Sequence, residues 1–187
     1  MHKILFKIKI NLLFLLISFL CLISVVGIDN VSFKSTEWLY TGESAQHQLG
    51  WHFFKNDIWR FPLGNNPNYG GEFSNSIVFS DAIPILALFF KSLKSFIPGN
   101  FQYFSFWYFI CFFLQLFFSF KIIKKFTGSV PYSLIGSLFF LISPIFIFRM
   151  NWHASVSAHW LLLFTLYLAL TTKTDESKFS WIFLIKC

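Results

Sequence analysis

Residues 29–81 form a polar, aromatic-rich stretch inside a chain that is otherwise strongly apolar. A connector between helices usually has about two to eight residues, and a much longer one is usually functional or disordered. Disordered segments are depleted in aromatics, whereas this stretch contains Trp51, Trp59, Tyr69 and several phenylalanines. We therefore expect an ordered, functional loop. It holds six of the eight acidic residues: Asp29, Glu37, Glu43, Asp57, Glu72 and Asp81.

The composition outside this loop is typical of a membrane protein. The 187 residues are 56% hydrophobic and 12% charged, whereas soluble domains average about 25% charged residues. The formal net charge of +7 comes largely from lysines at the edges of apolar runs, where positive residues orient helices, so it does not indicate a nucleic-acid partner. The isolated Cys21, Cys111 and Cys187 predict neither a disulfide framework nor a metal site.

The N-terminus predicts a first transmembrane helix over residues 8–28. Its apolar run is long enough to span a bilayer, and Ser24–Gly27 is a poor signal-peptide cleavage site. Cleavage remains the alternative. The basic flank places the N-terminus in the cytoplasm and loop 29–81 outside, which predicts a multi-pass protein of the cell inner (plasma) membrane. The lysines of this flank are Lys3, Lys7 and Lys9.

Further apolar runs predict further helices. Residues 82–97 form a short run interrupted by Lys91 and Lys94, which is either a re-entrant or interfacial helix or a short span whose lysines snorkel. The final run, 179–187, is too short to cross, so the chain reads as an N-terminal fragment or a truncated product. The remaining runs predict spans at 101–123, 130–148 and 154–172. Together they predict one all-α membrane domain over 1–187.

The distribution of positive charge favours a topology in which 82–97 does not cross the bilayer. The lysines at 121–125, Lys173 and Lys178 then lie inside, whereas Arg149–His153 lies outside. In this arrangement Arg149–His153 and the acidic loop meet at one face of the membrane.

Glu43 and His47 are four residues apart and would share one face of a helix. A carboxylate beside an imidazole can act as a general-base pair, and the alternative is a solvated helix face. Asp81 lies where the chain enters an apolar run, just before Pro84. It is either the N-cap of a helix beginning near Pro84 or a functional carboxylate held at the membrane surface.

Arg60 lies between two aromatic residues. It is either an exposed arginine stacked on them or a phosphate clamp. Arg149, His153 and His159 end one apolar run and begin the next. Histidines at a membrane edge are functional candidates, and the alternative is anchoring at the headgroups. No set of His, Cys, Asp and Glu in the sequence has the spacing of a structural zinc site.

Three consecutive motifs resemble those of a family of bacterial multi-pass membrane proteins without an assigned activity, which is similar to the GT-C glycosyltransferases. The motifs are Glu43-x3-His47-x-Leu-Gly50-Trp-x-Phe-Phe54, Trp59-Arg-Phe-Pro-Leu-Gly64-x-Asn-Pro-Asn-Tyr-Gly70 and Ser76-Ile-Val-Phe-x-Asp81-x-Ile-Pro84. Phe101-Gln-Tyr-Phe104 and His153-x5-His159-Trp-Leu-Leu-Leu163 add to the match, so the likeness covers residues from about 37 to 172.

The resemblance implies a GT-C-like helical membrane core with a long first external loop that contains juxtamembrane helices. It implies that an acid in this loop serves the acceptor and that the donor is a polyprenyl-phosphate sugar reached from the membrane lipid. It also implies members several times longer than this chain. Their usual loop acid is Asp, where this chain has Glu43.

On this reading the catalytic residues are Glu43 or Asp81, which would deprotonate an acceptor hydroxyl. The cofactor is open, with a divalent cation as one candidate and no metal ligand assigned. The alternatives are a transporter or flippase of lipid-linked saccharides and an inactive truncated product. The residues expected to bind substrate or its phosphate are His47, Arg60, Arg149, His153 and His159.

Overall fold

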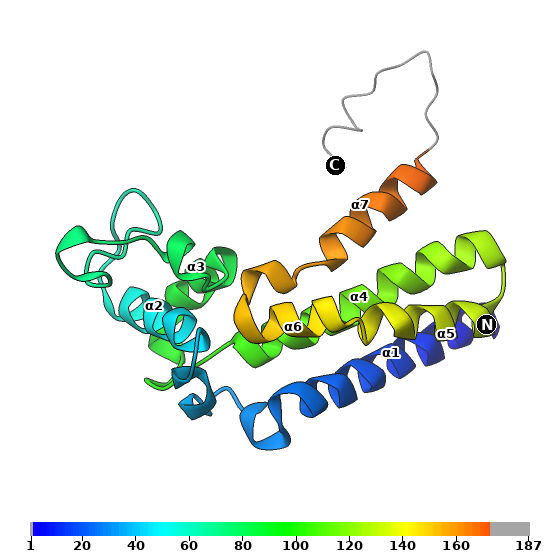
Figure 1. The fold of residues 1–187 in the computed structure, drawn as a ribbon, viewed down its shortest axis with the longest axis horizontal. Helices are drawn as coiled ribbons and strands as arrows, with labels where there is room; N and C mark the ends of the chain where they lie inside the picture. Colours follow the sequence, from blue (N-terminus) through cyan, green and yellow to red (C-terminus); the bar gives the residue numbers. More distant parts are fainter. Residues whose placement is uncertain (1, 173–187) are drawn as a thin grey trace, which may run out of the picture.

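The computed structural model describes residues 2–172, which are all-helical and, within that range, contain no strand beyond an isolated bridge between Asn65 and Ser76. The all-α prediction is confirmed. The helices form two parts: long helices make an extended bundle, and short helices from the loop make a module at one end of it (Figure 1).

Within residues 2–172, two helices are long and apolar enough to cross a membrane: α1 (His2–Val26) and α4 (Phe104–Thr127). Each is about 36 Å long, which exceeds the roughly 30 Å of a bilayer core. They pack side by side (Figure 1), with the rings of Phe14 and Phe120 5.1 Å apart. The start of α1 and the lysine-rich end of α4 therefore lie at the end of the bundle opposite the loop module.

The apolar run 130–148 forms two helices instead of one straight span. These are α5 (Val130–Leu141) and α6 (Pro144–Trp152), bent by 48°. Pro144 occupies the first turn of α6, where its missing N–H costs nothing, and it cannot continue the hydrogen bonding of α5. The pair makes a third candidate span only if it crosses as one bent unit.

The run 154–172 is also divided. A 3-10 turn, η6 (Ser155–Ser157), precedes α7 (Trp160–Thr171), which is only about 18 Å long and too short to cross alone. The first residues of the predicted span are instead part of the turn that contacts the loop module. The predicted span start at 179–187 lies outside the described residues.

The loop module begins after α1 and contains α2 (Ser44–Asn56) and α3 (Pro84–Ser92). Helix α3 is about 13 Å long, too short to cross a bilayer, and it packs against α2. The lysines of α3 and η5 (Lys94–Phe96) turn back to the module: Lys91 donates to Ile58 O at 3.1 Å and Lys94 to Asn56 O at 3.3 Å. The 3-10 turns of the module are η1 (Ile28–Asn30), η2 (Glu37–Tyr40), η3 (Gly71–Phe73), η4 (Ile77–Ser80) and η5 (Lys94–Phe96).

The segment just before and within the first turns of α4 joins the module to the bundle. The buried Trp51 donates its indole N–H to Phe101 O at 2.9 Å, and Gln102 N–H donates to Phe33 O at 2.8 Å. Trp107 donates its indole N–H to Ala154 O at 2.7 Å. The partners of these bonds come from three different parts of the chain, so the loop is an ordered unit fixed to the bundle.

Candidate functional site

Helix α2 places Glu43 and His47 on one face. Glu43 occupies the N-cap position, but its side chain makes no capping hydrogen bond, so its carboxylate is available to other groups. His47 lies one turn later and is 2% exposed. Residues four apart on a helix are neighbours, and both side chains therefore face the same partners.

Gly50, one turn after His47, brings η4 against α2. A Cβ atom at position 50 would lie 2.3 Å from the Cβ atom of Ser80. The buried Asn66 strengthens this approach by donating its amide N–H to Gly50 O at 3.0 Å. The glycine- and asparagine-rich segment folds back onto η4, where Ile77 N–H donates to Gly64 O at 2.8 Å. This segment thus supports the position of η4, and of Asp81 directly after it.

Asp81 follows η4 in a left-handed backbone conformation, with φ of 52°, and Ile83 has φ of 47°. Such angles are uncommon for residues other than glycine and are costly for a β-branched one. Asp81 does not cap α3, so the capping alternative is wrong: Ile83 precedes α3 and no side chain caps it. The two left-handed residues turn the chain, and Asp81 Oδ1 accepts a 3.0 Å hydrogen bond from Ser155 N–H.

Four side chains converge here, and we term them the carboxylate–imidazole cluster: Glu43, His47, Asp81 and His153. Asp81 Oδ2 lies 3.3 Å from His47 Nε2 and 4.0 Å from His153 Nδ1, and His153 Nδ1 lies 3.6 Å from Glu43 Oε2. Asp81 Oδ2 is buried and has no partner with hydrogen-bond geometry among the described residues. A buried carboxylate oxygen without such a partner calls for an explanation, and a catalytic role is one of the few available.

Burial is the main influence on the charge of His47. It lowers the pKa of the imidazole, and His153 lowers it further, whereas Asp81 and Glu43 oppose this change. An ordinary histidine has a pKa of about 6.5, so His47 is neutral at pH 7. Glu43 and His153, by contrast, are each 43% exposed. The cluster therefore has a less exposed half, at His47 and Asp81, and an open half, at Glu43 and His153.

Glu43, in the open half, borders a cavity of about 340 Å³, which lies within the usual range for ligand pockets. Its walls combine polar groups of the loop with aromatic side chains. Val25 and Val26 place it at the end of α1, one of the candidate spans. The other lining residues are Trp38, Thr41, Gly42, Glu43, Ser44, Tyr108, Met150 and Trp152.

The remaining candidate residues lie apart from the cluster. Arg60 pairs with Asp57, with Nε 2.9 Å from Oδ2, beyond the far end of α2 and about 20 Å along that helix from Glu43. Arg149 is half-buried in α6, one turn before His153. His159 contacts Phe146, with ring centroids 5.7 Å apart. The structure therefore brings together Glu43, His47, Asp81 and His153.

Several residues of the site were missed by the sequence predictions. Ser155 contributes a backbone N–H, and no side-chain type indicates such a role. Trp38 and Trp152 line the cavity, and the position of Trp152 next to His153 was the one available signal. No group of three or more His, Cys, Asp or Glu in residues 2–172 has the arrangement of a metal site, and we assign no cation ligands.

Comparison with known proteins gives one match. A family model described as "Domain of unknown function (DUF6311)" matches residues 15–187. No curated protein and no solved structure matches the chain. The matched region contains all four residues of the carboxylate–imidazole cluster and the whole loop module.

Proposed function

The chain belongs to the DUF6311 family, and we propose that it is a GT-C-like glycosyltransferase that moves a sugar from a polyprenyl-phosphate donor to an acceptor hydroxyl. The reaction takes place at the membrane face that carries the loop module. In the proposed topology this face is the outer side of the inner membrane, and the N-terminus is cytoplasmic. The observation that carries the proposal is the buried Oδ2 atom of Asp81, held between two imidazoles at the edge of the candidate spans.

Asp81 is the favoured general base. Its Oδ1 atom is engaged by Ser155 N–H, which fixes the carboxylate and leaves Oδ2 to receive a proton. As Oδ2 accepts the hydroxyl proton, the acceptor oxygen forms a bond to the anomeric carbon. The bond from that carbon to the phosphate oxygen breaks, and the electron pair leaves with polyprenyl phosphate. Attack opposite the leaving group inverts the anomeric centre.

The neighbouring side chains assist this transfer. His153 contacts both carboxylates, and in its imidazolium form both ring nitrogens donate, so it can neutralise a departing phosphate. Arg149 lies one helical turn before His153 and would add positive charge to this end of α6. Glu43 lines the cavity directly, so it orients the acceptor or replaces Asp81 as base. The cavity lies at the level where a lipid phosphate meets the membrane surface.

The hydrogen bonding of polar residues inside the bundle favours an enzyme over a transporter. A transport path requires polar side chains that line an opening. The buried Ser119 and Ser137 instead donate to backbone carbonyls of their own helices, at 2.7 Å and 2.8 Å. Gln115 reaches Phe140 O at 3.5 Å. These groups therefore serve helix packing in the bundle.

The test is an assay for sugar transfer by the chain in nanodiscs, with a longer family member in parallel. Labelled polyprenyl-phosphate sugars are supplied, and release of polyprenyl phosphate is measured for wild type, Asp81→Asn and the control Asp57→Asn. Loss of a positioned base lowers turnover by about 10²–10⁴-fold. Asp57 pairs with Arg60 away from the cluster, so its variant should retain activity.

Two results would overturn the proposal. One is wild-type turnover by Asp81→Asn, which would remove the base from the mechanism. The other is absence of transfer across a broad panel of donors together with movement of lipid-linked sugar across vesicles. The second result would establish a transporter.

A further inference from the structure

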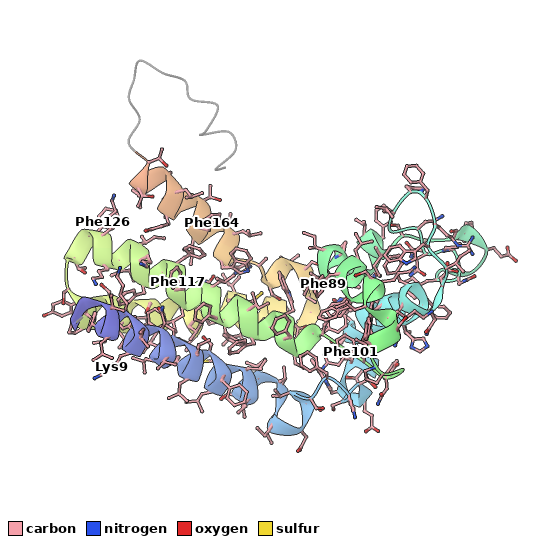
Figure 2. All side chains as sticks on the ribbon, turned by 180° about the vertical axis from the view of Figure 1, so that it is seen from behind. Lys9, Phe89, Phe101, Phe117, Phe126 and Phe164 are labelled. Carbon is pink, nitrogen blue, oxygen red and sulfur yellow. The ribbon has the colours of Figure 1, made fainter. Side chains whose placement is uncertain are left out.

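A second cavity lies at the opposite end of the bundle, between α1 and α4. Its volume is about 610 Å³, within the range of small-molecule sites. Figure 2 labels Lys9 of α1 and Phe126 of α4 at this end of the bundle, away from Phe101 near the loop module. The cavity is thus separate from the carboxylate–imidazole cluster. Its lining residues are Phe6, Lys7, Ile10, Asn11, Phe14, Phe117, Phe120, Lys121 and Lys124.

The lining has two chemically distinct zones. The deeper zone is apolar, where Phe14 and Phe120 are 1% and 3% exposed and their rings meet edge-on. The outer zone carries three ammonium groups and one amide, contributed by both helices. This order, apolar inside the bilayer and cationic at its edge, matches the order of groups in an anionic phospholipid.

Two of the lysines fold over the cavity wall. Lys121 Nζ lies 5.2 Å from the ring centroid of Phe117. Lys124 Nζ lies 5.7 Å from the ring of Phe120 and 5.9 Å from that of Phe6 on α1. Cation–π contacts of this length hold the ammonium groups near the apolar zone.

The charge in this cavity is uncompensated within the part of the chain that the structure describes. No described acidic side chain lies within 4.0 Å of Lys7, Lys121 or Lys124, since the described acids belong to loop 29–81 at the other end. The helix dipole stabilises positive charge at the C-terminal end of α4, but that effect is confined to the last turn of the helix. It does not explain Lys7, which comes from the opposite helix. A bound anion would offset the repulsion among the three.

We propose that this cavity binds the headgroup phosphate of an anionic phospholipid. The phosphate would lie among Lys7, Lys121 and Lys124, and the upper acyl chain would lie along Phe14, Phe117 and Phe120. Basic pockets between transmembrane helices are known to bind anionic lipid headgroups. The site does not depend on the proposed transferase activity, because it lies at the other end of the candidate spans.

The test is native mass spectrometry of the purified chain released from a zwitterionic detergent. Phosphatidylglycerol and phosphatidylcholine are added in equal amounts, and bound lipid is counted. The pocket variant is Lys7→Gln with Lys124→Gln. The matched control is Lys9→Gln with Lys125→Gln, which removes the same charge from the same two helices at positions outside the cavity lining. Circular dichroism establishes that both variants keep their helical content.

We expect the wild type to retain phosphatidylglycerol in preference to phosphatidylcholine. The pocket variant should bind phosphatidylglycerol about 25-fold more weakly, because each of the two lysines near the headgroup contributes about a factor of five. The control variant should bind phosphatidylglycerol with an affinity within about threefold of that of the wild type. A second pocket variant, Lys7→Arg with Lys124→Arg, keeps the charge and should retain binding.

Four outcomes would overturn the proposal. The first is an equal loss of bound phosphatidylglycerol in the pocket and control variants, and the second is no preference for phosphatidylglycerol in the wild type. The third is complete displacement of the bound lipid by inorganic phosphate, and the fourth is a second copy of the chain in the cavity in place of lipid. The third would indicate a phosphate site without a lipid component, and the fourth an interface between copies.

Discussion

A Cβ atom on Gly50 would lie 2.3 Å from the Cβ atom of Ser80 and 2.4 Å from its Oγ atom. Gly50 is three residues after His47, and Ser80 is directly before Asp81. The contact between these two small residues therefore sets how closely α2 approaches η4, and with it the 3.3 Å separation between His47 and Asp81.

Gly50→Ala should destabilise the loop module and disrupt the cluster. The added methyl group forces α2 and η4 apart, and overpacking of this kind costs about 1–3 kcal/mol. Thermal unfolding in detergent should show a lower midpoint, and the transfer assay should show lower turnover. Gly99→Ala is the matched control, because a Cβ atom there meets nothing within 4 Å.

A compensating change can test the same contact. Ser80→Gly removes the atoms that the new methyl group would strike, so the double variant Gly50→Ala with Ser80→Gly should recover part of the lost midpoint. If Gly50→Ala and the double variant have the same unfolding midpoint, the close approach of α2 and η4 at this position is not the cause of the lower stability.

The stability of the loop module should fall as the pH is lowered below about 6.5. Burial lowers the pKa of His47 in the folded state, whereas an unfolded histidine titrates near 6.5. Below that value the unfolded state binds more protons, so folding loses free energy until the pH falls below the folded-state pKa. The loss per pH unit from one group is at most about 1.4 kcal/mol.

Chemical denaturation at pH 7.5 and pH 5.5 would measure this dependence, with His47→Gln as the comparison. The variant should have a smaller difference between the two pH values than wild type. An unchanged difference would place the titrating group elsewhere in the chain.

Lys91 should contribute more to stability than Lys94, although each donates a hydrogen bond to a backbone carbonyl of the module. Lys91 is 3% exposed, donates to Ile58 O, and lies 3.9 Å from the ring centroid of Phe54. Lys91→Met leaves a carbonyl without its partner and removes a cation–π contact, at a cost of about 1–3 kcal/mol. Lys94→Met changes an exposed group and should cost about 0.5 kcal/mol or less. Comparing the two unfolding midpoints tests this order.

Glu43→Gln should separate function from stability. Glu43 and His153 are both 43% exposed, and an ion pair at such exposure contributes about 1 kcal/mol or less. The unfolding midpoint should therefore hardly change, whereas turnover in the transfer assay should fall at least about tenfold if the carboxylate orients or deprotonates the acceptor. Glu37→Gln, an exposed acid in η2, is the control. Full activity of Glu43→Gln would remove this residue from the mechanism.

The sequence predicted the features that depend on local pattern. An unbroken apolar run gave α1, and another gave α4, because helix length in a bilayer follows from the number of apolar residues. The spacing of Glu43 and His47 similarly placed both on one face of α2. Such predictions need only the period of the helix.

The features that depend on distant contacts could not be predicted in this way. The turn at residues 155–157 interrupts a predicted span and is held against the loop module by the hydrogen bond from Ser155 N–H to Asp81 Oδ1, whereas the break at Pro144 has a local cause in the proline itself. The left-handed conformations of Asp81 and Ile83 are unfavourable locally and persist only because tertiary contacts hold them. Arg60 pairs instead with Asp57, three residues before it in the sequence, and therefore lies outside the site.

The hydrogen bond between Asp81 and Ser155 joins residues 74 positions apart. During synthesis the loop module leaves the ribosome well before the turn that holds its carboxylate. The hydrogen bond from Ser155 N–H to Asp81 therefore cannot form until α4, α5 and α6 have been made. Assembly of the cluster at this face therefore requires that the chain has been made at least as far as η6.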